Sequence, residues 1–331
     1  MRFERQNTAA TGISEFWPRV FAFLIDGAIL AVPLLIIGYL FREIFFAMGP
    51  YGRIIAYAII IPYLGYFNSE KNSGQTIGKR ITNIAVVDKD NHYLSLGKSF
   101  LRAFILGLIF MLNGWRLPIL NNPILAFITT VIVFGGLLSL IYTFIFNRTT
   151  RQGIHDLVVG SYVVPAPPAP EMVRPEIPRI HRRFTYGLVG VGLLLGIAGL
   201  AIQAVRPSGF VTLEEGELAE LTELQTALMD TGEFYSVNVV RQNRRSLQGG
   251  DVLRDLNIDL WAKRTCLGNP DYCDETVAWA ARTAFEYFDG IEDLSGMRVA
   301  VVNRFDLGIT SGTLSQGTAW SIEDWHQELV D

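Results

Sequence analysis

Residues 17–40 read WPRVFAFLIDGAILAVPLLIIGYL, an apolar stretch that contains a single acidic residue, Asp26. Crossing a bilayer takes about 20 apolar residues at about 1.5 Å of rise each, so this stretch is long enough to span. A helix that enters the membrane at Trp17 places Asp26 about 13 Å deep, near the middle of the hydrocarbon. A charge at that depth costs about 3 kcal/mol or more, so Asp26 is expected to face protein or water and to have a partner. Arg19 lies on the same helical face, seven residues earlier, and is the expected partner.

Four further apolar runs follow, at residues 54–67, 100–112, 124–146 and 186–205. Continuous runs of this kind are typical of membrane-spanning helices, so the sequence predicts an all-α transmembrane helical bundle of about five helices. The run at 100–112 is short, and a re-entrant or surface position remains open for it. Residues 1–16 are polar and no small-residue cleavage site follows the first run, which argues against a removable signal peptide.

The net charge of −4 conceals an asymmetry along the chain. Up to Val205 there are 18 Lys and Arg against 10 Asp and Glu, whereas from Arg206 onward there are 10 against 22. The positive residues concentrate in the N-terminal segment 1–16, in a loop at 68–99 and around residues 148–183, so the positive-inside rule predicts that these segments are cytoplasmic. Five crossings then place residues 206–331 on the extracytoplasmic side.

Both cysteines of the chain, Cys266 and Cys273, lie in this last segment. A turn-rich spacer, Leu-Gly-Asn-Pro-Asp-Tyr, separates them and can close a small loop. An oxidising compartment favours a disulfide between them, and two unpaired thiols are the alternative. Two sulfurs without a nearby His/Cys pair do not complete a tetrahedral site, so no metal is predicted.

A proline-dense linker at residues 165–183 separates the first four apolar runs from the fifth. We expect it to be an extended, semi-rigid spacer, with docking of an SH3-like partner as the alternative. Arg179, Arg182 and Arg183 then precede a predicted transmembrane helix at 184–205. Gly192 and Gly196 have the spacing of a close helix-packing face, but glycine is also tolerated in membrane helices, so both interpretations stay open.

The segment 206–331 has the patterns of a small soluble α+β domain. Thr212 is positioned to cap a helix with leucines at 218, 221, 224 and 228 on one face, and Asp274 to cap a second helix. Alternating patterns predict strands around 235–239, 258–262, 297–305 and 315–321, followed by a short helix near 322–329. This order predicts helices on one face of a largely antiparallel sheet. Residues 308–318, rich in small hydroxyls, are interpreted as a polar hairpin loop, with a ligand or partner site as the alternative.

Three motifs within residues 11–164 resemble the RDD family of bacterial multi-pass membrane proteins, named for one arginine and two aspartates. The first runs from Arg19 to Asp26 as RVFAFLID. The second is Gly74-Gln75-Thr76-Ile77-Gly78-Lys79-Arg80, followed by Ile84-Ala-Val-Val-Asp88. The third places Asp156 in Gly153-Ile-His-Asp, and Gly160-Ser161 stands where the family usually has a small residue and a threonine.

The resemblance implies a multi-pass protein of the bacterial plasma membrane, with an RDD-like domain at 17–164 that lies in the lipid bilayer. It also implies a set of intramembrane charges formed by Arg19, Asp26 and Asp156. The family has no settled activity. Transport of ions or small ligands has been suggested, and at least one relative looks like a sodium/proton antiporter. Those charges are therefore interpreted either as an ion or proton relay or as a charge-paired interior that joins the first helix to the cytoplasmic segments.

Other functions find little support in the residues. The segment 74–80 lacks the glycine spacing of a phosphate loop and the following Ser or Thr, so we expect a turn that feeds a strand at 81–87, which pairs with a strand at 157–164. The four histidines are scattered, and no catalytic motif is present, so neither an enzyme nor a cofactor is predicted. Outside the membrane region the sequence has no stripe of Lys and Arg interleaved with aromatic residues, so nucleic-acid binding is not predicted. The alternative to transport is a non-enzymatic scaffold or sensor whose extracytoplasmic domain contacts a protein partner.

Overall fold

The structure is a computed structural model that describes residues 12–115, 122–169, 171–205, 215–245 and 252–330. The chain divides into two compact units. The membrane unit comprises Met1–Ile36, Arg53–Val205 and Leu307–Thr310. The α+β unit comprises Ile37–Gly52, Arg206–Asp306 and Ser311–Asp331.

The predicted apolar runs form helices in the structure. These helices are α2 (Phe16–Leu40), α4 (Gly52–Phe67), α6 (Leu96–Leu112), α7 (Pro123–Thr130), α8 (Gly136–Phe146) and α10 (Arg179–Val205), with a π-helical turn, η4 (Val131–Gly135), joining α7 to α8. Within the described residues, four stretches are long and apolar enough to cross a membrane: Phe16–Leu40, Arg42–Phe67, Pro123–Phe146 and Arg179–Ala201. Helix α6 has 17 residues and is not one of the four, so its complete crossing stays a prediction.

Helix α2 has one apolar, exposed face and one face that is buried against protein. Trp17, Phe21 and Leu24 are more than half exposed, as expected of side chains that meet hydrocarbon. Ala22 and Asp26, four residues apart, are buried on the opposite face. The single carboxylate of this helix therefore faces protein.

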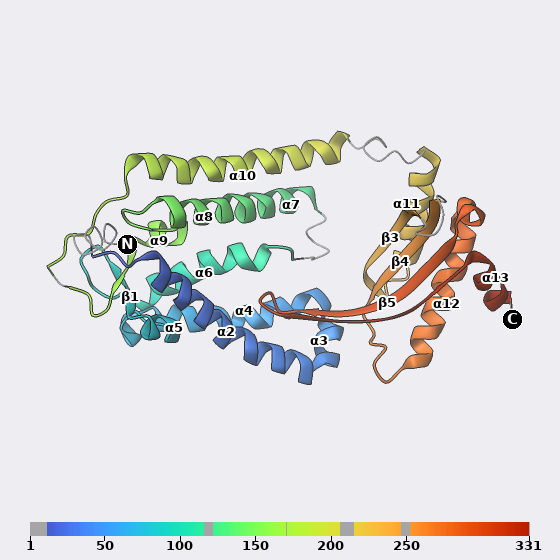
Figure 1. Ribbon diagram of the computed structural model, residues 1–331, viewed down its shortest axis with the longest axis horizontal. Coiled ribbons are helices and arrows are strands. Elements are labelled where there is room, and N and C mark those ends of the chain that lie inside the picture. Colours follow the sequence, from blue (N-terminus) through green and yellow to red (C-terminus); the bar gives the residue numbers. More distant parts are fainter. Residues whose placement is uncertain (1–11, 116–121, 170, 206–214, 246–251, 331) are drawn as a thin grey trace. The chain divides into compact units, whose positions relative to one another are not determined.

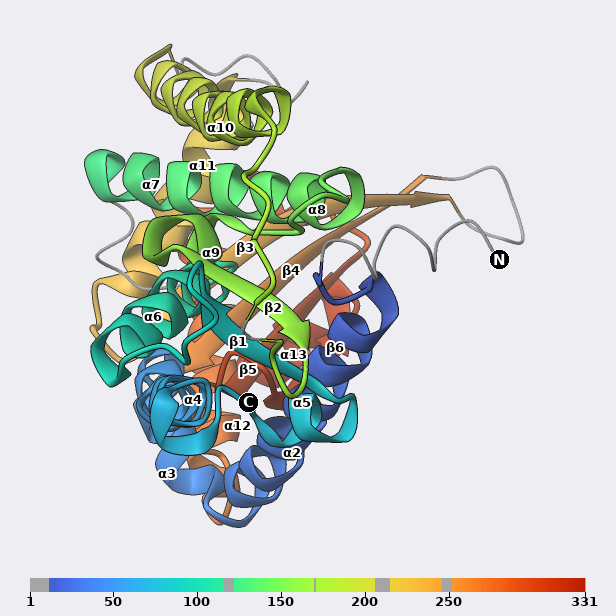
Figure 2. The same cartoon turned by 90° about the vertical axis from the view of Figure 1, so that its left-hand side faces the viewer.

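Two short strands pair outside the helices of the membrane unit (Figure 2). β1 (Ile84–Asp88) runs antiparallel to β2 (Ser161–Pro165), with Val86 opposite Val163, so the predicted pairing is confirmed. Both predicted strand starts were wrong, because α5 (Ile77–Ile81) and α9 (Ile154–Val159) occupy the residues just before each strand. Thr76 caps α5 through its side chain, and Gly160, with φ of +68°, ends α9. A 3₁₀ turn, η2 (Glu70–Asn72), precedes α5.

The proline-dense linker packs on this strand pair and is more than a spacer. The Arg174 side chain is buried and donates to the Gly12 carbonyl at 2.8 Å. The Tyr162 hydroxyl of β2 donates to the Pro175 carbonyl at 3.2 Å. Ser14 N–H bonds to the Val163 carbonyl at 3.0 Å, so the chain before α2 also joins the pair.

Helix α10 lies alongside α7 and α8 (Figure 1). At Gly192 a Cβ atom would stand 2.7 Å from the Gly135 nitrogen and 2.8 Å from its Cα, so only glycine allows the two backbones to approach this closely. Ser139 of α8 donates to the Thr185 carbonyl of α10 at 2.9 Å. Of the two interpretations of Gly192, these contacts favour close helix packing.

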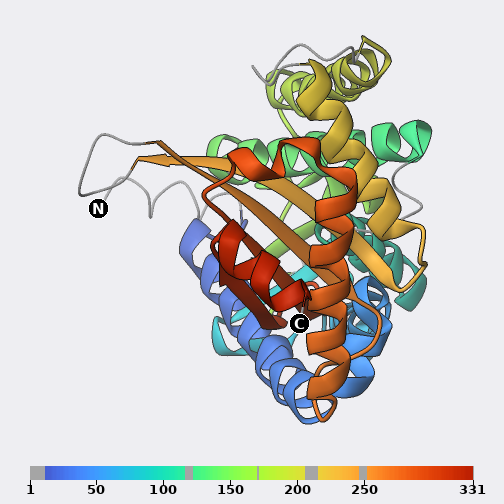
Figure 3. The same ribbon diagram turned by 90° about the vertical axis from the view of Figure 1, so that its right-hand side faces the viewer.

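The α+β unit is a four-stranded sheet with helices packed on one face (Figure 3). Its elements in chain order are α11 (Glu215–Met229), β3 (Phe234–Arg245), β4 (Val252–Ala262), α12 (Pro270–Tyr287), η5 (Asp289–Asp293), β5 (Gly296–Asp306), β6 (Ser311–Trp320) and α13 (Ile322–Val330). The strand order is β3-β4-β5-β6, with β4 and β5 parallel and the two outer pairs antiparallel. The predicted order and the largely antiparallel sheet are confirmed.

The core of this unit forms between the sheet and its helices. Leu224, Ile258 and Val299 are fully buried, and the Trp325 indole of α13 donates to the Met297 carbonyl at 2.8 Å. Helix α12 starts at Pro270 rather than after Asp274, because proline suits the first turn of a helix. The predicted cap Thr212 lies outside the described residues.

Two details of the unit differ from expectation or add to it. Residues 311–318 are strand β6 and not a hairpin loop, since the register to β5 is continuous from Ser311 onward. The segment that follows α2 also belongs to this unit, and it contains α3 (Arg42–Met48) and a 3₁₀ turn, η1 (Gly49–Tyr51). The rings of Phe45 and Phe46 lie 6.1 and 6.0 Å from that of Phe305.

The contact of Gly192 with Gly135 predicts a sharp positional effect in α10. Gly192→Ala is expected to lower the free energy of unfolding by about 1–3 kcal/mol, because the added methyl group meets backbone that cannot yield. Gly190→Ala is the matched control, since nothing lies within 4 Å of its Cβ position. Thermal unfolding of the purified chain measures both, and equal effects would contradict the predicted packing.

Candidate functional site

The Asp26 carboxylate receives three hydrogen bonds, all from outside its own helix. The Tyr63 hydroxyl of α4 donates to Oδ1 at 2.7 Å, and the Gly78 N–H of α5 donates to the same oxygen at 2.8 Å. The Thr76 hydroxyl donates to Oδ2 at 2.5 Å. Asp26 is only 6% exposed, so these donors replace the water that a buried carboxylate has lost. The carboxylate thereby connects α2 to α4 and to the segment that leads into β1.

Gly78 is the residue that makes this approach possible. A Cβ atom there would stand 2.3 Å from the Ala22 carbonyl oxygen and 3.0 Å from Asp26 Oδ1. Only a residue without a side chain can present its N–H to the carboxylate at this distance.

Arg19 does not pair with Asp26, which corrects the sequence-based expectation. It donates to two carbonyl oxygens, those of Arg151 at 2.6 Å and Val163 at 2.9 Å. The two side chains are two helical turns apart, about 10 Å along the axis, and each finds its partner in a different segment. No ion pair joins them in the part of the chain that the structure describes.

Asp156 of α9 pairs with Arg102 of α6, at 2.8 Å between Nε and Oδ1. The Ser161 hydroxyl donates to the same oxygen at 2.7 Å, and the Gly153 N–H lies 3.3 Å from Oδ2. His155 Nε2 is 3.4 Å from Oδ2 and 3.2 Å from the Arg102 guanidinium. Arg102 and Asp156 are 6% and 3% exposed, so this is a buried and well-bonded ion pair.

The predicted set Arg19, Asp26 and Asp156 is thus part of a larger buried charge cluster. The cluster consists of Arg19, Asp26, Lys79, Arg102, His155 and Asp156. Lys79, which keeps part of its surface exposed, donates to the Asn68 side-chain oxygen at 2.6 Å. Electrostatic interactions link Lys79 to Arg19, Asp26, Arg102 and Asp156.

Burial and neighbouring charges together set the protonation of the cluster members outside the spanning helices. Burial alone would raise the pKa of Asp156, but the Arg102 charge, His155 and the Ser161 hydrogen bond hold that pKa below its usual range. Burial lowers the pKa of His155 to about 4 against the opposing effect of Asp156, so the imidazole is neutral at pH 7. Burial and the Arg102 charge lower the pKa of Lys79 to about 7, while Asp26 acts in the opposite direction.

The motif at residues 74–80 forms a turn and a short helix that serve the cluster. Gly74, with φ of +63°, accepts the Val86 N–H at 2.9 Å through its carbonyl oxygen. The Gln75 side chain donates to the Ile84 carbonyl at 3.0 Å, and that of Arg80 donates to Asn72. These contacts explain the motif as the support that presents Thr76 and Gly78 to Asp26.

Sequence reasoning missed Arg102, Tyr63 and the role of His155. Arg102 was visible as a cation within the apolar run 100–112, the same kind of signal that identified Asp26. His155 was interpreted as a satisfied or solvated histidine, and the structure shows a buried ring whose Nε2 lies 3.2 Å from the Arg102 guanidinium. Both His155 and Asp156 reach the Arg102 guanidinium, so that adjacent residues converge on one partner.

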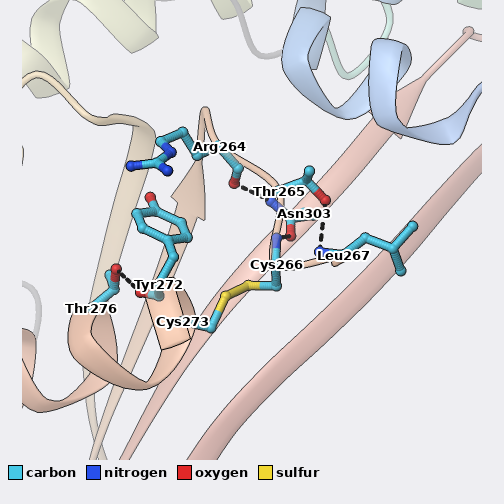
Figure 4. Close-up of a disulfide and its surroundings, with 8 residues drawn as sticks. All are labelled: Arg264, Thr265, Cys266, Leu267, Tyr272, Cys273, Thr276 and Asn303. Atoms are coloured by element: carbon cyan, nitrogen blue, oxygen red, sulfur yellow. Dashed lines mark hydrogen bonds between the residues drawn. A yellow bond between two sulfur atoms is a disulfide. The ribbon is translucent and has the colours of Figure 1, made fainter. Parts of the chain in front are cut away.

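In the α+β unit, the structure joins Cys266 to Cys273 in a disulfide with 5.5 Å between the Cα atoms (Figure 4). The Cys266 N–H donates to the Asn303 side-chain oxygen at 2.9 Å, and Asn303 donates to the Arg264 carbonyl at 2.7 Å. Both cysteines are buried, so the bridge fixes the loop that enters α12. No group of three metal-ligating side chains occurs among the described residues.

Comparisons with known proteins match the membrane unit. Residues 13–160 match the sequence model of the RDD family. The uncharacterized protein YckC of Bacillus subtilis is 30% identical over 162 residues, which cover 47% of this chain and 87% of that protein. The uncharacterized protein YxaI of the same organism is 31% identical over 170 residues, 45% of this chain and 95% of that protein. No solved structure matches.

The Arg102–Asp156 pair predicts a large cost for removing one partner alone. Arg102→Met leaves a buried carboxylate without its counter-charge and is expected to lower the free energy of unfolding by about 3–5 kcal/mol. Adding Asp156→Leu to this variant is expected to restore much of the loss. Arg298→Met is the matched control, because its ion pair with Asp259 at 2.9 Å is partly exposed and should contribute less than about 1 kcal/mol. Equal losses in the two single variants would contradict this assignment.

Proposed function

This chain belongs to the RDD family of multi-pass membrane proteins, and on that premise we propose that it is a non-enzymatic scaffold that presents the α+β unit outside the cytoplasm. In this proposal the buried charge cluster is structural. It holds the segments around β1 and β2 against the helices, and the α+β unit contacts a protein partner.

The observation that carries the proposal is that both carboxylates are buried and hydrogen-bonded to protein donors. Asp26 accepts from Tyr63, Thr76 and Gly78, and these bonds occupy both of its oxygens. Asp156 is held by Arg102 and by the Ser161 hydroxyl. A carboxylate that exchanges a cation with water must release such donors in each cycle, at a cost of about 1–3 kcal/mol for each buried bond left unmade.

The orientation rests on charge and on the disulfide. The excess of Lys and Arg before Val205 supports a cytoplasmic position for the N-terminus and for the segments that contain β1 and β2. The Cys266–Cys273 bridge supports an oxidising compartment for the α+β unit. The predicted crossing of α6 brings the number of crossings to five. With five crossings, the charge distribution and the disulfide both favour an extracytoplasmic position for the α+β unit.

A second candidate is transport of ions or protons, which one observation favours. The cluster places Lys79, with a pKa lowered to about 7, in electrostatic contact with Asp26. An amine that titrates near neutral pH and interacts through space with a membrane carboxylate is suited to accept and release protons. In that case Lys79 and Asp26 form the cytoplasmic entry of the path.

Flux measurements separate the two candidates. The purified chain is reconstituted in vesicles with a pH-sensitive dye inside, and a sodium or proton gradient is applied. The scaffold proposal predicts the same pH change as in protein-free vesicles, because both carboxylates stay bonded to protein. A flux above that background that Asp26→Asn abolishes, at unchanged protein abundance, would overturn the scaffold in favour of transport.

A further inference from the structure

Strand β6 is an outer strand of the four-stranded sheet and pairs with β5 on one side. Its sequence is SGTLSQGTAW, which contains no charged residue and no proline. The register to β5 runs without a shift from Ser311 opposite Asp306 to Trp320 opposite Met297. β6 is therefore a long, regular and uncharged edge.

The outer side of β6 has no strand partner among the residues that the structure describes. Its alternate residues Ser311, Thr313, Ser315, Gly317 and Ala319 are exposed. An edge strand presents a row of backbone N–H and C=O groups that can bond to another strand. Natural sheets usually block such edges with charges, prolines or bulges, and β6 has none of these.

The opposite edge of the same sheet is protected, which makes the contrast informative. β3 carries Arg241, Arg244 and Arg245 and has a register shift between Phe234 and Ser236. One edge of this sheet thus has the usual features against pairing, whereas the other lacks them. This difference identifies β6 as the edge of the sheet that lacks features against pairing with another strand.

We propose that β6 pairs antiparallel with β6 of a second copy of this chain, so that two sheets join into one. A two-fold symmetric antiparallel pair places one residue opposite its own copy. Any charged residue at that position would meet a like charge, and β6 offers only uncharged residues. The strand is therefore compatible with itself along its whole length.

Attachment to a membrane favours this partner over a free peptide. Two copies in one bilayer hold their α+β units on the same side, which raises their effective concentration. A single strand pair buries less surface than the interfaces of stable dimers in solution. Confinement in one bilayer raises the local concentration of the two copies, and this compensates for the small contact area. The inference goes beyond the proposed function, since a scaffold can present one copy or two.

Cysteine cross-linking in vesicles tests the pairing in the full chain. Ser315→Cys and Gln316→Cys place a thiol at the strand centre on either face of the sheet, and Gln242→Cys on β3 is the matched control. The native Cys266 and Cys273 are buried in their disulfide and do not compete. With a mild oxidant, at least one β6 variant is expected to give about ten-fold more covalent dimer than the β3 control. This difference should persist when the lipid-to-protein ratio is raised.

A charge added to the edge supplies the second arm. Thr313→Lys in the background of the better cross-linking variant is expected to reduce the covalent dimer about five-fold, because a charge on an edge strand opposes pairing with another strand. Retention of the Cys266–Cys273 disulfide in the lysine variant reports that its α+β unit has folded. If the lysine variant loses this disulfide, the comparison of the β6 cysteine variants with Gln242→Cys decides the test. Equal cross-linking at β6 and β3, or cross-links from β6 to a different protein, would overturn the pairing with a second copy.

Discussion

The buried carboxylate of Asp26 fixes how α4 and the segment before β1 lie against α2. A charge within an apolar helix must be satisfied by donors, and water is scarce at that position. The chain supplies these donors from α4 and from the turn before β1, at distances of 2.5 to 2.8 Å. The position of that turn relative to α2 is consequently set by a requirement of α2 itself.

The second carboxylate imposes a similar constraint on the other strand. Asp156 lies in α9, the short helix that precedes β2, and its pairing with Arg102 connects that region to α6. Arg19 adds bonds from α2 to the carbonyl oxygens of Arg151 and Val163. Asp26 holds the segment before β1, and Asp156 holds the segment before β2. Because β1 and β2 pair with each other, both carboxylates support the same two-stranded sheet. A buried charge is costly when alone, but here each has the hydrogen bonds that make burial tolerable.

The sequence predicted elements better than partners. Asp26 was identified because a charge in an apolar run is visible in a single helix, and the strands of the α+β unit because alternation is local. The predicted partner of Asp26, Arg19, was wrong. The actual donors Tyr63, Thr76 and Gly78 lie 37, 50 and 52 residues away along the chain, and helical spacing does not predict contacts at that separation. The strand starts near Ile81 and Leu157 were wrong for a local reason, since short capped helices there carry the same apolar residues. The strand predicted around 315–321 is the second half of β6, but the start of β6 at Ser311 was interpreted as a loop, because small hydroxyl residues and glycines are common in both edge strands and loops.

Amide hydrogen exchange of the full chain in lipid tests most directly whether Asp26 holds the segment before and within β1. Replacing Asp26 by leucine keeps the branched shape and the number of side-chain heavy atoms and removes both acceptor oxygens. We predict faster exchange at residues 77–88, while the strands of the α+β unit keep their wild-type rates. Unchanged protection of residues 77–88 in this variant would contradict the account, because the segment would then be held by contacts other than those to Asp26.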